Sequence, residues 1–314
     1  MDRITIDSIE LVLSHPDQQE REWIGQEELL EQILACWLVL TPDDFPLCPR
    51  LLGKPGMGKT TLAIAAARTL GKPVYLYQCT MDTRPEDLII TPVIANNGRI
   101  QYHGSSLLTA MIRGGVAILD EANRMSEKSW ASLAPLLDNR RYVESIIAGI
   151  KIHAHPEFRC CVTMNDDAST YEVPDYIISR LQPMIHLDFP DKEEELAILR
   201  YNLNFAPEEI LRLTVAFLQK SHEARLEYSI RDGLSIARYA MKMRGGTSRK
   251  HPMRLREAFQ RAVEQVLGKD ALDIRKKAAQ INARNLNNIV FLEDFFMNQK
   301  DWDKGNQEEG ERGQ

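Results

Sequence analysis

Hydrophobic positions in the first 190 residues alternate between short apolar runs and stretches with helical spacing. The runs RLL, PVYLYQC, VAILD, FRCCVT and MIHLDF, which begin at residues 50, 73, 116, 158 and 184, predict β-strands. Between them, TLAIAAARTL (61–70) and SEKSWASLAPLLD (126–138) have the periodicity of helices. Strands that alternate with helices indicate a parallel sheet with flanking helices, which is an α/β fold.

The pattern changes after Pro190. Residues 191–203, 208–226, 230–243 and 252–268 all have helical spacing, and the strand-like runs end. We therefore predict an α/β domain over residues 1–190 and a small all-helical lid domain over 191–300. The last segment, DWDKGNQEEGERGQ (301–314), is acidic and lacks apolar periodicity, so we expect a disordered tail.

Composition narrows the class of protein. The chain has 314 residues, 27% of them charged, and a net charge of −6, which argues against a general polyanion binder. Its N-terminus is too acidic for a signal peptide, and the apolar run from Ile33 to Leu40 is too short for a membrane span. The five cysteines lack paired or metal-ligand spacing, and Cys160 and Cys161 are expected to be small buried side chains, with a vicinal disulfide as the alternative. These features predict a cytoplasmic protein without a membrane anchor.

A glycine-rich segment follows the first of these strands. GKPGMGKT, from Gly53 to Thr60, fits G-x-x-x-x-G-K-[ST] and precedes a predicted helix. Its backbone N–H groups and the helix N-terminus would hold the phosphates of ATP, while Lys59 would reach the β- and γ-phosphates and Thr60 would bind Mg²⁺. A glycine-rich turn that only resembles the motif is the alternative. The expected nucleotide contacts here are Lys54, Pro55, Gly56, Met57, Gly58, Lys59, Thr60 and Thr61.

Two adjacent carboxylates end the apolar run at residues 116–119. Asp120 and Glu121 lie where the carboxyl edge of a parallel sheet binds ligands. We predict that Asp120 holds Mg²⁺ through its waters and that Glu121 activates the attacking water. The alternative is an ordinary solvated strand end.

These motifs, in this order, resemble those of the AAA+ ATPases. FRCCVTMND is similar to the strand that ends in sensor 1, which implies that Asn165 orients the nucleophilic water. That family usually has Asn-Pro, whereas this chain has Asn165-Asp166. VPDYIISRLQPMIHLDF resembles the segment with the arginine finger, which implies that Arg180 reaches the γ-phosphate of a neighbouring subunit. A surface arginine at a helix end is the alternative.

Two further segments extend this resemblance. YSIRDGLSIARYA begins a predicted helix, with Ser229 as N-cap and Asp232 completing a capping box. The helix dipole disfavours a cation in the first turn, and the resemblance implies that Arg231 is sensor 2 and faces a phosphate. WIGQEELLEQIL resembles the "hhGQ" segment of the family, which implies adenine contacts at Ile24 and Gly25. A plain helix start would explain the same letters.

The branch of the family is indicated by DEANR and by two inserts. DEANR (120–124) resembles the DEINR of MoxR-type ATPases and their dynein-related relatives. The predicted hairpin IITPVIANNGRIQYHG (89–104), with an Asn97-Gly98 turn, resembles their helix-2 insert, and residues 141–155 resemble their pre-sensor-1 insert. The resemblance covers residues 23–243. Neither the first twenty residues nor those after about Gly245 contain a motif that we can assign.

The resemblance implies an ATPase that forms a homo-oligomeric ring of six copies and remodels or activates a protein client, which in this family often has a von Willebrand A or metal-binding module. We expect the hairpin from Ile94 to Tyr102 to face the ring's channel, with Arg99 and Tyr102 as contacts. Packing against a neighbouring subunit is the alternative for this hairpin.

Two other functions remain open. A motor of a nucleic-acid-processing or defence complex would use the basic segment 241–277, although a solvated helix face explains its charge better. A scaffold that binds ATP without hydrolysis is the second alternative, and the Asp120–Glu121 pair argues against it.

Overall fold

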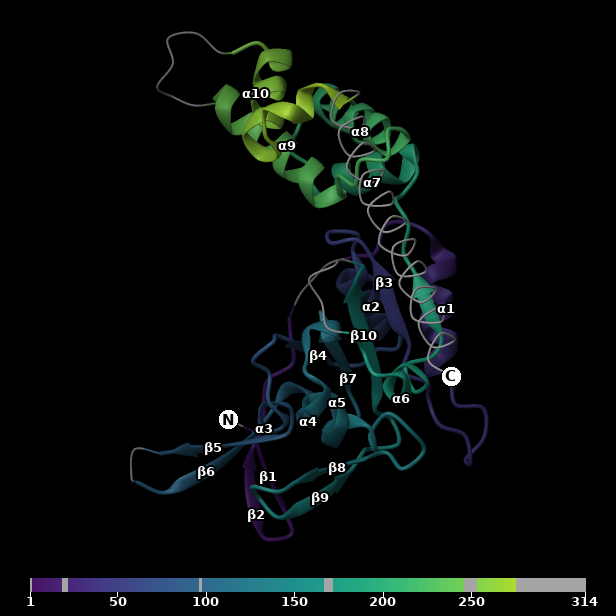
Figure 1. The fold of residues 1–314 in the computed structure, drawn as a ribbon, viewed down its shortest axis with the longest axis vertical. Helices are drawn as coiled ribbons and strands as arrows, with labels where there is room; N and C mark the ends of the chain where they lie inside the picture. Colours follow the sequence, from purple (N-terminus) through teal and green to yellow (C-terminus); the bar gives the residue numbers. More distant parts are fainter. Residues whose placement is uncertain (1, 19–21, 96–97, 167–171, 246–252, 275–314) are drawn as a thin grey trace, which may run out of the picture. The chain divides into compact units, whose positions relative to one another are not determined.

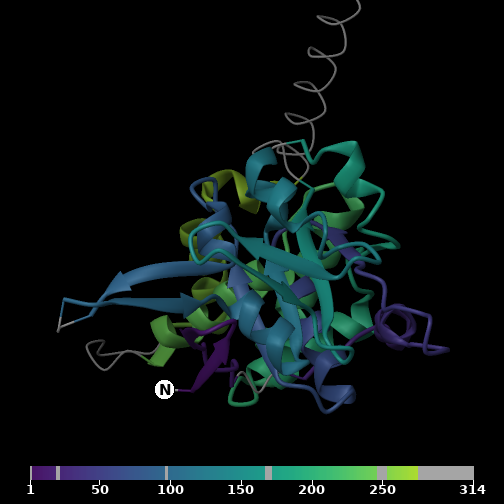
Figure 2. The same ribbon diagram turned by 90° about the horizontal axis from the view of Figure 1, so that it is seen from below.

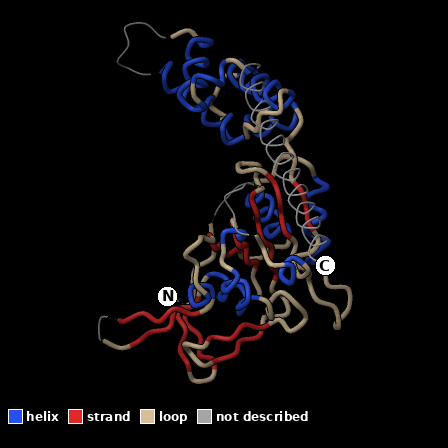
Figure 3. The backbone as a smooth tube through the Cα atoms, viewed as in Figure 1, coloured by secondary structure: helices blue, strands red, loops and turns tan. Residues whose placement is uncertain are grey.

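The computed structural model describes residues 2–18, 22–95, 98–166, 172–245 and 253–274 (Figure 1). The predicted acidic tail, the end of the predicted lid domain and Asn97 of the predicted turn lie outside these residues. The chain forms two compact units, residues 1–190 and 191–314. Figure 3 shows strands in the first unit, whereas the described part of the second is helical.

A five-stranded parallel sheet forms the centre of the first unit. Its order is β11 (Met184–His186), β3 (Arg50–Gly53), β10 (Arg159–Asn165), β7 (Val116–Asp120) and β4 (Val74–Gln78). The central strand β10 is buried along its whole length, as its apolar sequence predicts. The predicted α/β fold is therefore confirmed. The last strand is shorter than the predicted run at 184–189.

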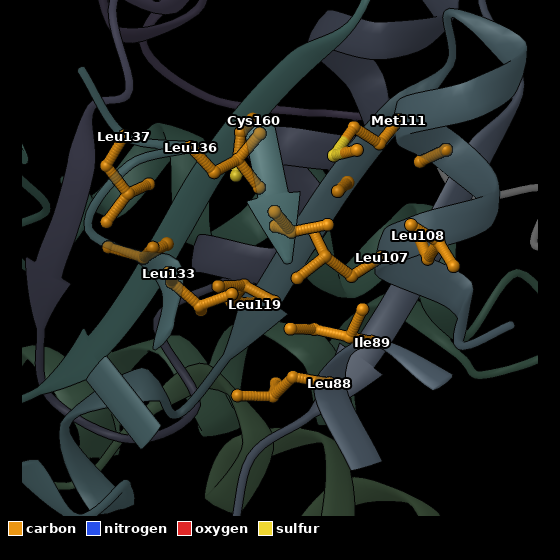
Figure 4. Close-up of a cluster of buried hydrophobic side chains, with 14 of the residues drawn as sticks. Leu88, Ile89, Leu107, Leu108, Met111, Leu119, Leu133, Leu136, Leu137 and Cys160 are labelled. Carbon is orange, nitrogen blue, oxygen red and sulfur yellow. The ribbon is translucent and has the colours of Figure 1, made fainter. Parts of the chain in front are cut away.

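Helices cover both faces of this sheet. On one face, α1 (Glu27–Trp37) and α2 (Lys59–Thr69) pack with Leu51, Ile118 and Cys161. On the other, α4 (Ser106–Arg113) and α5 (Glu127–Leu133) build a second apolar cluster, in which leucines of α4 face Leu119 and Cys160 (Figure 4). Helix α5 ends before Pro135, so it is shorter than the predicted helix at 126–138.

The predicted hairpin at residues 89–104 is present, and it belongs to a larger sheet. After the short helix α3 (Pro85–Leu88), β5 (Ile90–Ile94) and β6 (Ile100–Gly104) pair antiparallel and extend from the unit (Figure 2). The N-terminal strands β1 (Arg3–Ile6) and β2 (Ile9–Val12) add to β6 in the order β1-β2-β6-β5. The first twenty residues contain no motif that we can assign, but their strand β2 pairs with β6 at the base of the hairpin and supports it.

The second predicted insert is also a hairpin. Strands β8 (Tyr142–Ser145) and β9 (Ile150–His153) pair antiparallel, and Val143, Ile150 and Ile152 point into the core. At the turn, Ile146 and Ile147 are exposed. In the same unit, the short helix α6 (Asp175–Ile178) leads through Arg180 to β11.

The second unit contains α7 (Lys192–Asn202), α8 (Glu208–Glu223), α9 (Ile230–Gly245), α10 (Leu255–Leu267) and a 3₁₀ turn, η2 (Lys269–Leu272). Asp191 caps α7 in a full capping box. At α9 the Asp232 carboxylate accepts from the Ser229 backbone N–H (2.8 Å) and hydroxyl (2.9 Å). The Ser229 hydroxyl therefore donates here, instead of accepting as an N-cap does.

No helix in the described part of the chain is both long enough and apolar enough to span a membrane.

Candidate nucleotide-binding and hydrolysis site

The glycine-rich loop turns from β3 directly into α2. Gly58 has φ +87°, which favours glycine, and a Cβ there would lie 3.2 Å from the Trp23 ring. The buried Lys59 ammonium donates to the carbonyls of Gly53 (2.7 Å) and Lys54 (2.9 Å). The strand–loop–helix geometry therefore presents the lysine and the N-terminus of α2 at the carboxyl edge of the sheet, where phosphates bind.

Three side chains from different strands and helices meet at one carboxylate oxygen. The hydroxyls of Thr60 and Thr163 each donate to Oδ1 of Asp120, both at 2.6 Å. They meet because β10 lies between β3, which leads to Thr60, and β7, which ends in Asp120. A hydroxyl and a carboxylate are the hard oxygen ligands that Mg²⁺ prefers, so this donor set fits the metal that accompanies a nucleotide.

Glu121 is held by hydrogen bonds to three side chains. Its backbone is left-handed, with φ 53° and ψ 42°, which is unusual for a non-glycine residue and common at functional sites. Its N–H donates to the Thr163 hydroxyl (3.0 Å). The Asn165 amide donates to Oε1 (3.1 Å) and the Arg124 guanidinium to Oε2 (2.7 Å). The carboxylate is therefore held in a single orientation.

Asn165 is itself fixed by its neighbours. The Asn123 amide, on the 3₁₀ turn η1 (Ala122–Arg124), donates to the Asn165 carbonyl (2.8 Å). Asn165 is buried at the end of β10, as expected for a polar group at a strand end that faces the site. Asp166, which stands where the family has proline, accepts from Lys54 of the loop through its carbonyl (3.2 Å). The Asp166 carboxylate also pairs with the Lys54 ammonium (3.5 Å), so the departure from the family pattern adds an ion pair between the two motifs.

Sequence reasoning missed Thr163, Asn123, Arg124 and Trp23 as site residues. Thr163 had a detectable signal, because it precedes Asn165 by two positions and so lies on the same face of its strand. Asn123 and Arg124 belong to the DEANR segment, which indicated the family but not a role for either side chain. Trp23, beside Gly58, lies one residue before the predicted adenine contacts Ile24 and Gly25, which are partly buried.

The structure does not join Arg180 to the glycine-rich loop. Arg180 Nε donates to Asp138 (3.1 Å), and its guanidinium also bonds the Tyr176 carbonyl. Bonds from Arg140, and secondarily from Arg180, lower the pKa of Asp138 to about 2. The backbone N–H of Arg50, which begins β3, donates to the Pro183 carbonyl (3.1 Å), so the Arg180 segment lies at the amino end of this strand. The glycine-rich loop leaves the other end, about 10 Å away.

The predicted sensor 2 residue and the basic segment lie in the second unit. Arg231 is in the first turn of α9. In α10, Arg261 pairs with Glu257 (2.9 Å), and Lys269 after it pairs with Glu264 (3.7 Å). In this part of the basic segment acids therefore balance bases, as on a solvated helix face.

Residues 50–181 match the family described as AAA domain, dynein-related subfamily. MoxR of Paracoccus denitrificans is 30% identical over 157 residues, covering 49% of this chain and 45% of MoxR. CbbQ of Hydrogenophilus thermoluteolus is 27% identical over 150 residues, covering 46% and 55%. NirQ of Pseudomonas aeruginosa, a denitrification regulatory protein, is 28% identical over 158 residues, covering 48% and 57%. The chain matches about half the length of these curated relatives.

Among solved structures, the fold is similar to that of RuvB of Thermotoga maritima, a Holliday junction branch migration motor. The TM-score is 0.51 at 16% identity, over 77% of this chain and 70% of RuvB. At this identity the likeness concerns the fold alone.

Proposed function

Because this chain belongs to the MoxR-like, dynein-related branch of the AAA+ ATPases, we propose that it hydrolyses ATP in a cytoplasmic ring of six copies and uses the energy to remodel or activate a protein partner. The observation that carries the proposal is the network at Asp120 and Glu121, which joins strands β7 and β10 to α2, the helix that follows the glycine-rich loop.

Each member of this network has a role in hydrolysis. Lys59 leaves its two carbonyls to bind the β- and γ-phosphates, and the backbone N–H groups around Gly58 hold the remaining oxygens. Thr60 and Asp120 hold Mg²⁺, which when bound neutralises charge on the phosphates. Glu121 accepts the proton of the attacking water, and Asn165 orients Glu121 and that water. Arg124, on the second carboxylate oxygen, keeps Glu121 in place between turnovers.

Arg180 supplies the last charge from a neighbouring copy. The segment that contains Arg180 lies at the amino end of β3, whereas the glycine-rich loop follows the carboxyl end. Arg180 is therefore at the opposite edge of the sheet from the nucleotide site of its own chain. A guanidinium given in trans offsets negative charge in the transition state and makes hydrolysis depend on assembly. Arg231 of the second unit is proposed to sense the nucleotide, and Ile24 and Gly25 to contact adenine.

A partner protein is supported by exposed apolar side chains on the inserted hairpin. Ile94 and Ile100 pair across β5 and β6 near the tip, and both are exposed. Apolar groups presented on a projecting hairpin are suited to contact another protein. Tyr102 does not fit its predicted role, because it packs against the core at the hairpin's base. A partner with a von Willebrand A domain is a proposal from family resemblance alone.

The test is Glu121→Gln, which preserves the shape of the side chain and removes the base. We expect ATP turnover to fall by at least about a hundredfold, as for loss of a general base, with nucleotide affinity unchanged. Steady-state phosphate release and binding of a fluorescent nucleotide measure the two quantities. Glu127→Gln, at an exposed acid on α5, is the matched control and should hydrolyse at the parent rate. Equal rates in Glu121→Gln and the parent would contradict the proposed mechanism.

A further inference from the structure

The loop between α1 and β3, residues 38–47, exposes a concentration of apolar side chains. Within it Leu38 is 60% exposed, Leu40 76% and Leu47 47%, and Val39 and Phe45 are exposed by more than a third. Single exposed leucines are common on soluble proteins, but five large exposed apolar side chains within ten residues of one loop are an unusual concentration, which we call the apolar patch. Such a patch marks a surface that another molecule covers.

The loop is held in a defined conformation. The Asp44 carboxylate accepts from the backbone N–H groups of Leu40 (2.9 Å) and Phe45 (2.9 Å), and the Asp44 N–H donates to the Thr41 carbonyl (3.0 Å). Leu47 N–H donates to the Cys36 carbonyl (2.8 Å), which closes the loop onto α1. Because the loop is preorganised, little conformational entropy is lost when a partner covers it.

Anchoring contacts place the loop at the amino edge of the central sheet. Before it, the Trp37 indole N–H donates to the Cys160 carbonyl (3.0 Å), at the start of β10. After it, the Arg50 guanidinium donates to the carbonyls of Ile178 (3.1 Å) and Leu181 (3.0 Å). These two residues flank Arg180. The loop therefore borders the segment that contains Arg180, as Figure 1 shows beside α6.

We propose that the loop at residues 38–47 is a docking surface for a second copy of this chain, around the Arg180 that reaches that copy's nucleotide. The inference rests on the proposed function, in which Arg180 acts in trans. Arg180 lies at one edge of the sheet and the nucleotide site at the other, so the contact is head-to-tail, and repetition of such a contact gives a ring when its rotation closes. Tyr176 and Met184, exposed on either side of Arg180, extend the surface.

This arrangement also explains why the patch is apolar. A guanidinium that approaches phosphates acts more strongly when water is excluded around it. An apolar rim beside Arg180 would exclude that water when two copies meet. A lipid surface is a poorer occupant, because the exposed Asp43 lies among these side chains and would be repelled by anionic lipids.

The test uses the full chain in the Glu121→Gln background with ATP, where nucleotide stays bound. Leu38→Ser with Leu40→Ser removes the most exposed part of the patch, and Leu38→Met with Leu40→Met keeps it apolar. Sedimentation velocity over a concentration series measures assembly, and a fluorescent nucleotide measures binding. We expect the serine variant to need at least about tenfold more protein to assemble, at unchanged nucleotide affinity and melting temperature. The methionine variant should assemble like the parent.

The outcomes separate the loop from the proposed function. If the parent assembles and the serine variant assembles equally well, the docking surface is wrong and the ring ATPase stands. If the parent remains monomeric at every concentration, the proposed ring fails, and the docking surface fails with it. The loop would instead bind a lipid surface if the serine variant assembles like the parent but no longer co-sediments with vesicles of phosphatidylcholine and phosphatidylglycerol, to which the parent binds.

Discussion

The Thr163 hydroxyl connects the Asp120 carboxylate to the backbone of Glu121. It donates to Asp120 (2.6 Å) and accepts from the backbone N–H of Glu121 (3.0 Å), and its side chain is buried. Through these two bonds the left-handed backbone at Glu121 is held against β10. Since strain of this kind persists only where surrounding contacts determine it, Thr163 positions the proposed base.

Thr163→Val preserves volume and removes both hydrogen bonds. We expect kcat to fall by roughly tenfold or more, since tenfold corresponds to about 1.4 kcal/mol of lost positioning, with nucleotide affinity little changed. Unfolding free energy should fall by about 1–3 kcal/mol, because an Asp120 oxygen and a backbone N–H lose a buried partner. Steady-state hydrolysis and urea unfolding measure the two effects. Thr163→Ser, which keeps the hydroxyl, should restore kcat; a valine variant with the parent's kcat would refute this role.

At the scale of elements, the hairpin of β5 and β6 divides into a base and a tip with different roles. At the base, Tyr102 pairs with Leu11 of β2 and packs on the core. Toward the tip, Ile94 and Ile100 face each other across the strands and are exposed. The base therefore contributes to folding, while the tip is available to a partner.

Ile94→Ser with Ile100→Ser should leave basal ATP hydrolysis within about twofold and lower the unfolding free energy by less than about 1 kcal/mol, the upper range for a cross-strand pair. The Glu121→Gln protein, which keeps ATP bound, should hold its partner protein in a pull-down, and adding the two serine changes should abolish that binding. Tyr102→Ser is the matched comparison at the base and should lower stability by about 1–3 kcal/mol, because it removes buried aromatic area. If basal hydrolysis collapses in the tip variant, the hairpin belongs to the subunit interface instead.

At the scale of the whole molecule, the two units have separate cores, and the core of the helical unit contains an ionisable group. Glu195 of α7 is fully buried, with the His222 ring of α8 3.7 Å away. Burial, with a smaller contribution from Asp191, raises the pKa of Glu195 from an ordinary 4.5 to about 7, and the nearby Gln219 side chain opposes this. Burial also lowers the pKa of His222, so near neutral pH the ring does not compensate the carboxylate.

The contribution of Glu195 to the stability of the helical unit should therefore be most favourable below about pH 4.5. It should be lost as the pH rises to about 7, because the folded unit must then contain a buried carboxylate. Glu195→Gln removes this dependence. Relative to the parent, its unfolding free energy should rise between pH 5 and pH 8 by an amount on the order of 3 kcal/mol at most. Urea unfolding at both pH values measures the difference. A difference that is the same at pH 5 and pH 8 would contradict the assignment.

The positions of the principal residues of the candidate site were predictable because these residues lie in short continuous segments. A glycine-rich turn between a strand and a helix, and two acids at the end of a buried strand, have their geometry set by local backbone preferences. The predicted strands and helices followed from the same local periodicity. That is why Lys59, Thr60, Asp120 and Glu121 could be named before their positions were known.

Only the tertiary structure revealed which distant segments meet. Thr163 joins Asp120 because β10 lies between β3 and β7, and Arg180 lies away from the loop because its segment begins at the opposite end of β3. The strands β1 and β2 are too short for a periodic signal; they form because β6 offers an edge to β2, which in turn pairs with β1. Hydrophobic periodicity shows which face of a strand or helix is buried. Strand order and register depend instead on the burial of apolar side chains summed over the whole chain.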